Sequence, residues 1–143
     1  MKKLVFAAML ALAPAAGWAK GVMHNIAVHV NSGDAKVMNM ALNNVENVAA
    51  YYAEQGDEVT IEVVAYGPGL NMLIAGKSPV SDRIKTMSLA NEKLTFAACG
   101  NTHRKMSKKA GKNIELMEEA TMVTSGVVRL VQLQEQGFAY VRP

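Results

Sequence analysis

The hydrophobic and polar positions of this chain follow two spacings, one typical of buried strands and one of amphipathic helices. Near-continuous apolar runs rich in β-branched residues predict strands over residues 23–30, 58–66 and 93–99. Between them, apolar side chains recur at helical spacing and predict helices over 35–54 and 78–91. Such alternation is typical of α/β domains with a largely parallel sheet.

Shorter segments continue the alternation. Glycine and proline predict a turn at 67–69, and residues 70–76 a short helix. After the third strand, the pattern predicts a basic helix, a short strand, a helix and a terminal strand, over 101–111, 114–117, 126–136 and 138–141. We therefore expect an α/β fold with a mostly parallel five-stranded sheet, helices on both faces and right-handed crossovers.

The first residues have a different pattern. Met1-Lys2-Lys3 precedes a short apolar run over 4–13, and Gly17 and Ala19 supply a small-x-small end. The run is about half the length that a membrane-spanning helix needs. This pattern predicts a secretory signal peptide over 1–19, cleaved after Ala19, and a periplasmic or secreted protein without membrane insertion after cleavage. Residues 20–143 are then one domain.

Charge and cysteine content narrow the classes of function. The 15 basic residues fall to 13 without Lys2 and Lys3, against 12 acidic residues, so net charge gives no indication of nucleic-acid binding. Cys99 is the one cysteine of the chain, so an internal disulfide is impossible. In an exported protein its thiol is either buried and inert, reactive, or linked to another molecule.

The carboxyl ends of the predicted strands give the candidate site. In open parallel sheets, ligands bind beyond these ends, and three of them carry loops with glycine. Cys99 is the candidate reactive residue. The candidate pocket residues around it are His29, Asn31, Tyr66, Gly67, Gly69, Gly100, Asn101, Thr102 and His103.

Cys99 stands at the last strand position before a helix. Unpaired backbone N–H groups and the positive end of the helix dipole favour a thiolate there, and the basic or ionisable His103, Arg104 and Lys105 could add to the effect. A strand-end cysteine that merely packs is the alternative. His29 could assist Cys99 as a base, or it could be an ordinary hydrogen-bonded histidine.

Two further features have alternative interpretations. The basic helix is either a solvated face or a docking patch for an acidic partner or anionic substrate. Eight of the ten methionines follow residue 19 and could indicate copper(I), but they form no dense Met-x-x-Met cluster, and Met38 and Met87 fall on apolar helix faces. We therefore expect no metal or other cofactor.

Three segments together resemble the DsrE/DsrF-like family. They are Ala65-Tyr66-Gly67-Pro68-Gly69, Phe96-Ala97-Ala98-Cys99-Gly100-Asn101-Thr102 and Gly137-Phe138-Ala139-Tyr140-Val141-Arg142-Pro143, and the asparagine-rich first helix also fits. The resemblance covers essentially the whole mature chain and is greatest to small, exported, single-domain members.

The resemblance implies a compact α/β domain that assembles into trimers or hexamers. It also implies that Cys99 accepts sulfane sulfur as a persulfide and passes it to a partner, as a carrier more than as a turnover enzyme. The secretory signal departs from the family's cytoplasmic sulfur relays. The alternative is a non-catalytic oligomeric protein that binds a small ligand or serves assembly, with Cys99 buried and inert.

Overall fold

The described part of the chain, residues 21–143 in a computed structural model, alternates strands and helices as the sequence predicted. The predicted signal peptide and its cleavage site lie outside the described residues. The elements are β1 (Met23–Val30), α1 (Ala35–Glu54), β2 (Glu58–Ala65), the 3₁₀ helix η1 (Gly67–Leu73), α2 (Ser81–Ala90), β3 (Leu94–Cys99), α3 (Gly100–Ala110), β4 (Ala120–Val123), α4 (Gly126–Glu135) and β5 (Ala139–Val141).

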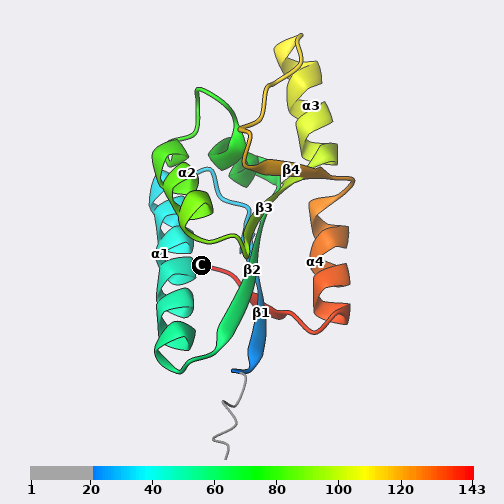
Figure 1. Ribbon diagram of the computed structural model, residues 1–143. Coiled ribbons are helices and arrows are strands. Elements are labelled where there is room, and N and C mark those ends of the chain that lie inside the picture. Colours follow the sequence, from blue (N-terminus) through cyan, green and yellow to red (C-terminus); the bar gives the residue numbers. More distant parts are fainter. Residues whose placement is uncertain (1–20) are drawn as a thin grey trace, which may run out of the picture.

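All five strands form one parallel sheet in the order β4-β3-β2-β1-β5 (Figure 1). The predicted fold class is therefore confirmed, and the sheet is wholly rather than mostly parallel. The carboxyl ends of β1, β2 and β3 meet at one edge because Val30 pairs with Ala65, and Ala65 pairs with Ala98. The predicted site loops thus leave the sheet side by side.

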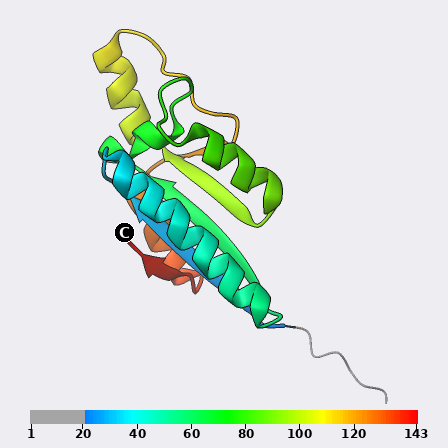
Figure 2. The same ribbon diagram turned by 90° about the vertical axis from the view of Figure 1, so that its left-hand side faces the viewer.

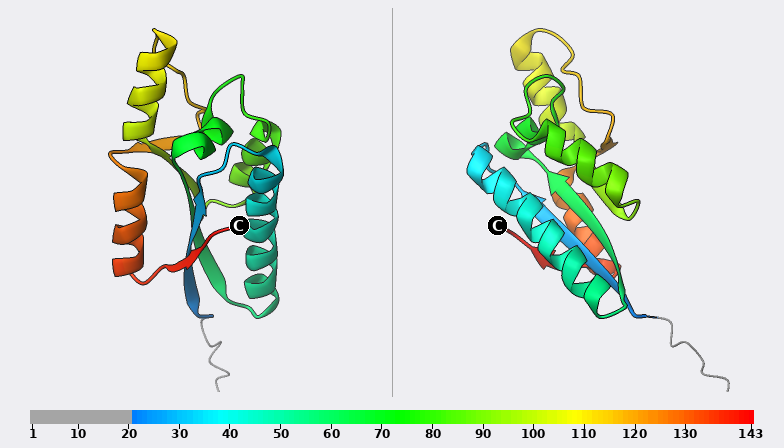
Figure 3. Two further views of the ribbon diagram at one scale, coloured as in Figure 1. Left: turned by 180° about the vertical axis from the view of Figure 1, so that it is seen from behind. Right: turned by 60° about the vertical axis from the view of Figure 1, so that its left-hand side comes forward.

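Helices cover the two faces unequally. Helices α1 and α2 lie on one face and α4 on the other, while α3 projects beyond the carboxyl edge (Figures 1 and 3). Figure 2 shows α1 running diagonally along its face with α2 next to it. The apolar stripe of α1 turns inward, and the Asp34 carboxylate caps this helix by accepting the N–H of Lys36 at 2.8 Å. No helix among the described residues has the length and apolarity needed to cross a membrane.

The fourth strand differs from its predicted position. The apolar residues of 114–117 do not join the sheet: Leu116 forms an isolated antiparallel bridge with Ile74, and the Met117 N–H donates to the Leu73 carbonyl at 2.9 Å. The strand is β4, at 120–123, a segment for which no strand was predicted. Its residues are all exposed or half-buried, because β4 is an edge strand that presents no buried apolar run.

Two helix starts also differ from prediction. Gly67-Pro68-Gly69 opens η1 instead of forming a separate turn, with proline in the first helical turn. Helix α2 begins at Ser81, not at 78–79, because Ser78 donates its N–H to the Ile74 carbonyl and closes a preceding turn. The Ser78 hydroxyl accepts the N–H of Val80 and shapes that turn rather than capping the helix.

Candidate functional site around Cys99

Cys99 occupies the junction of β3 and α3, as the sequence predicted. It is the last residue of the strand and the N-cap of the helix, with φ −67° and ψ 113°. Its side chain lies on the α4 face of the sheet, because Ala97, two residues earlier, packs with Leu130 of α4. Only 4% of Cys99 is exposed. The thiol is therefore covered, at the carboxyl edge of the sheet.

Hydrogen-bond donors converge on the Cys99 sulfur. Burial alone raises the pKa of this thiol, but hydrogen bonds from the Thr102 hydroxyl and from the backbone N–H groups of Gly126, Thr102 and Asn101 bring the pKa below its ordinary value. The last two N–H groups belong to the first turn of α3, where backbone donors have no intrahelical partner. The local structure thus favours the thiolate, the form that reacts with sulfur electrophiles.

Thr102 connects the sulfur to the second site loop. Its Oγ1 accepts the backbone N–H of Gly67 at 2.9 Å, so the hydroxyl proton is left to point to the Cys99 sulfur. Gly67 has a positive φ of 53°, a conformation that glycine adopts without strain. The turn after β2 therefore orients the hydroxyl that stabilises the thiolate.

Gly126 closes the site from the α4 side. A Cβ at this position would lie 2.9 Å from Tyr66 Cδ1, 3.0 Å from Tyr66 Cβ and 3.2 Å from Cys99 Cβ. Only glycine lets the start of α4 approach the cysteine this closely. From the sequence, Gly126 was predicted only as a helix start, because nothing local to residues 124–126 indicates which strand end it contacts.

His29 lies on β1, with β2 between it and the strand of Cys99. Its Nδ1 is 2.6 Å from the Tyr140 hydroxyl, and its ring stacks on Tyr66 with centroids 4.6 Å apart. Burial, and then the Arg142 charge, lower the pKa of His29, so its neutral form is favoured. Strands β1 and β3 are two strand spacings apart, about 10 Å, which is beyond the reach of a hydrogen bond between His29 and Cys99. The structure therefore places His29 beside Tyr66 rather than as a base in contact with Cys99.

The loop after β1 borders the site at a greater distance from the sulfur. Asn31 accepts a hydrogen bond from the Arg142 guanidinium at 3.3 Å, which ties this loop to the C-terminal residues. Gly69 packs so closely on the end of β1 that a Cβ there would lie 2.2 Å from the Val30 carbonyl oxygen. These contacts fix the two loops against each other and hold Gly67 in place.

In the first turn of α3, some residues donate hydrogen bonds to the Cys99 sulfur and others anchor the helix to the rest of the chain. His103 is buried and its Nε2 donates to the Ile114 carbonyl at 2.6 Å, so it anchors the segment after α3 and is not a contact of Cys99. The Asn101 side chain accepts a hydrogen bond from the Arg104 guanidinium, while the Asn101 backbone N–H donates to the Cys99 sulfur. Gly100 is required for packing, because a Cβ there would lie 2.9 Å from the Val123 carbonyl.

A partly buried ion pair lies farther along the same face. Arg129 of α4 donates through Nε and a terminal nitrogen to both oxygens of Glu62, each at 2.6 Å. Glu62 is only 8% exposed. This pair was not predicted, although a carboxylate in the middle of an apolar strand indicates that a cation packs against it.

The ion pair borders an open groove of about 330 Å³. Its floor is formed by β3 and β4, and the lining residues are Glu62, Thr95, Phe96, Ala97, Thr121, Val123 and Arg129. Val123 is the residue of β4 that pairs with Cys99 of β3, so this end of the groove lies next to the cysteine across the sheet. Another cavity, of about 470 Å³, lies away from Cys99, between α2 and the segment 115–119.

The described residues contain no group of three or more His, Cys, Asp or Glu side chains that could hold a metal ion. The convergent groups around Cys99 are hydrogen-bond donors to one sulfur atom. Such an arrangement stabilises an anion, and it is the arrangement that a nucleophilic thiol needs.

The comparisons with known proteins find similarity among solved structures. No family model matches, and the search of curated proteins gives no significant match. The structure of MTH1491 from Methanobacterium thermoautotrophicum, a protein of unknown function, is 32% identical, with a TM-score of 0.67, over 84% of this chain and 99% of that chain. With this identity over nearly all of MTH1491, the chain belongs to the same protein family as MTH1491.

Proposed function

We propose that the protein is a sulfur carrier in which Cys99 accepts sulfane sulfur and passes it on as a persulfide. The observation that supports this function best is the set of four hydrogen-bond donors around the Cys99 sulfur, which lowers the pKa of the thiol despite its burial. A thiolate is the form that attacks sulfur electrophiles. Because the Cys99 site is closely packed, further oxidation of the product is limited. The resemblance to the DsrE/DsrF-like family points to the same chemistry.

The reaction balances without an added oxidant. The Cys99 thiolate attacks the outer sulfur of a donor R–S–SH, the donor S–S bond breaks, and R–S⁻ leaves with the electron pair, giving Cys–S–SH. An acceptor thiolate then attacks the outer sulfur of Cys–S–SH, and the Cys99 thiolate is released. The N–H groups of Gly126, Thr102 and Asn101 would stabilise the anionic sulfur before and after each transfer.

The test is an intact-mass measurement on the protein starting at Lys20, with Cys99→Ser as the matched control. After treatment with polysulfide and removal of the excess, wild type gains the mass of one sulfur atom and loses it on reduction, while Cys99→Ser gains nothing. No gain in wild type, together with alkylation of Cys99 only after unfolding, would exclude the carrier function.

The alternative is a binding or assembly protein with an inert cysteine. Two observations favour it: only 4% of Cys99 is exposed, and the cysteine is not among the lining residues of the groove beside Glu62. Iodoacetamide separates the two functions, because a carrier must be alkylated in the folded state at a rate well above that set by global unfolding.

The proposed carrier would be exported and oligomeric. Three valines on the outer side of α4 support self-association, because Val127, Val128 and Val131 are 55%, 50% and 49% exposed. A trimer or hexamer that buries them would dissociate in Val128→Glu/Val131→Glu, as measured by light scattering of wild type and variant. N-terminal sequencing of the exported protein should begin at Lys20, which tests the predicted cleavage after Ala19.

A further inference from the structure

Helix α3, which follows Cys99, has one strongly basic side. Four cationic side chains of the helix, and that of Lys112 two residues after its end, are all exposed: Arg104, Lys105, Lys108, Lys109 and Lys112. At 3.6 residues per turn, the four on the helix fall within an arc of about 140°. We call these five residues the cationic stripe. Residues 100–112 carry no carboxylate, so the stripe has one sign of charge.

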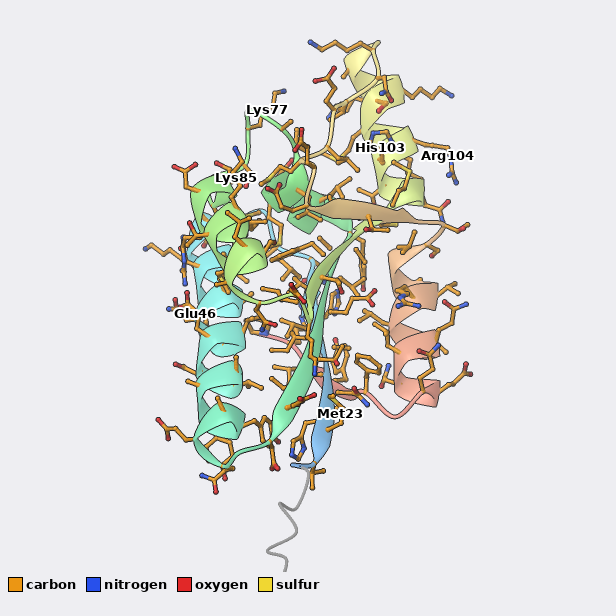
Figure 4. The ribbon with its side chains drawn as sticks, viewed as in Figure 1. Met23, Glu46, Lys77, Lys85, His103 and Arg104 are labelled. Atoms are coloured by element: carbon orange, nitrogen blue, oxygen red, sulfur yellow. The ribbon has the colours of Figure 1, made fainter. Side chains whose placement is uncertain are left out.

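The opposite side of α3 holds the helix to the molecule. His103 donates to the Ile114 carbonyl, the Ser107 hydroxyl accepts the Ile114 N–H at 3.1 Å, and the half-buried Met106 packs against the main core. In Figure 4, His103 points toward the segment that follows the helix and Arg104 points outward. The four cations on the helix therefore face away from the rest of the chain, along a helix that projects beyond the sheet (Figure 1), while Lys112 borders a cavity beside residues 74–77.

The stripe is unfavourable for the isolated fold. Arg104 and Lys108, and Lys105 and Lys109, are like-charge pairs four residues apart, a spacing that destabilises a helix. The ion pairs shown by residues 21–143 include none of the five cations. The helix dipole favours Lys108 and Lys109 in the last turn, but it does not account for Arg104 and Lys105 in the second turn. A binding partner would supply the missing counter-charge.

The distribution of charge indicates what kind of partner fits. Residues 21–143 contain 12 basic and 12 acidic side chains, so outside the stripe seven basic residues face twelve acidic ones. A nucleic acid or an anionic membrane extends well past one helix and would meet this acidic remainder, which repels it. A protein whose acidic patch is about the size of the stripe makes the favourable contact alone.

We propose that the cationic stripe is the docking surface for an acidic partner protein that receives sulfur from Cys99. This inference rests on the proposed carrier function, because it places the acceptor on the helix whose first turn stabilises the cysteine. The helix is about 16 Å long. A partner lying along it presents neighbouring residues to the Cys99 end, where its thiolate attacks the outer sulfur of Cys–S–SH and releases the Cys99 thiolate.

The test uses two probe peptides that each contain one cysteine, one flanked by six glutamates and the other by six lysines. Binding is measured by fluorescence polarisation on Cys99→Ser protein, and sulfur transfer by the mass of the peptide after mixing with persulfidated protein. The variants are Lys105→Glu/Lys108→Glu/Lys109→Glu and a matched control, Lys36→Glu/Lys85→Glu/Lys93→Glu. The control lysines are also exposed. Lys85 lies away from α3 (Figure 4), and Lys93 precedes β3 at the opposite edge of the sheet.

The acidic peptide should bind and react faster than the basic peptide, with a preference that falls as salt rises from about 0.05 to 0.2 M. Charge reversal in the stripe should weaken both processes by about tenfold or more, while the control changes them by about twofold or less. Equal effects of the two triple variants, or tighter binding of an oligonucleotide or phosphatidylserine vesicles than of the acidic peptide, would overturn the proposal.

The two proposals fail in different ways in this design. If Cys99 forms no persulfide but the acidic peptide still binds the stripe in the Cys99→Ser background, the carrier function fails and the docking surface remains. If the persulfide forms and transfers equally to both peptides, the carrier function remains and the docking surface is excluded.

Discussion

The two faces of the sheet differ in both packing and chemistry. The face under α1, α2 and η1 buries one large cluster that includes Phe96, Leu42 and Ile61, each at most 1% exposed. The face under α4 buries a small cluster of mostly small side chains: Ala27, Val64, Ala97, Leu130 and Leu133. The main apolar core of the described chain is thus on one side of the sheet.

The thinly packed face carries the reactive and titratable groups. Cys99, His29 and the Glu62–Arg129 pair all lie on the α4 side, and Tyr66 packs between the first two. Polar and reactive groups would be costly inside the large cluster, where each needs a partner. The comparison shows how one small domain keeps its stability and its candidate chemistry on opposite sides of a sheet, so substitutions on each side should have different consequences.

The largest effect is expected on the densely packed face. Leu42→Ala removes a fully buried side chain of α1 and should lower the free energy of unfolding by about 2–5 kcal/mol, measured in denaturant. The rate of Cys99 alkylation in the folded variant should stay within about twofold of wild type, because Leu42 packs on the face of the sheet opposite to the Cys99 side chain. The control Leu89→Ala, at an exposed position of α2, should change stability by less than about 0.5 kcal/mol.

An intermediate effect is expected where α4 meets the cysteine. Gly126→Ala places a Cβ against Tyr66 and Cys99 and should destabilise the protein by about 1–3 kcal/mol. It should also slow the alkylation of Cys99, because the Gly126 N–H moves away from the sulfur. Ser125→Ala is the control, since the Ser125 side chain makes no capping hydrogen bond. Unchanged alkylation in Gly126→Ala would show that this N–H does not support the thiolate.

The smallest change in stability, but a clear change in reactivity, is expected at Thr102. Thr102→Val removes the hydroxyl between Gly67 and the Cys99 sulfur and should destabilise the fold by about 1 kcal/mol. The pKa of Cys99 should rise toward its ordinary value, which shifts the pH–rate profile of alkylation to higher pH. Thr102→Ser should restore the profile, and an unshifted profile in Thr102→Val would contradict this role.

The direction of the associated pH dependence follows from linkage. Because the pKa of Cys99 is lower in the folded than in the unfolded state, the thiolate stabilises the fold fully above the unfolded pKa. That stabilisation is lost as the pH falls through the folded pKa. The stability difference between wild type and Cys99→Ser should therefore increase with pH across this window, and the increase should be smaller when both proteins carry Thr102→Val.

Local patterns predicted most of the fold. The limits of β1 and α1 agree with the sequence prediction, because a continuous apolar run and a 3.6-residue stripe are properties of consecutive residues. The position of Cys99 between β3 and α3 was predicted for the same reason. The edge strand β4 was missed because half-exposed residues carry neither pattern.

The sequence by itself determined the α/β class, the parallel strands and the placement of Cys99 at a helix start, since these follow from local periodicity and helix geometry. Only the tertiary structure decided the sheet order and the partners of the site residues. Gly67 and Thr102 are 35 positions apart, Glu62 and Arg129 are 67 apart, and His29 and Tyr140 are 111 apart. A hydrogen bond between residues so far apart cannot be inferred from the periodicity of one sequence. It depends on how the elements pack and not on the residues adjacent to either partner.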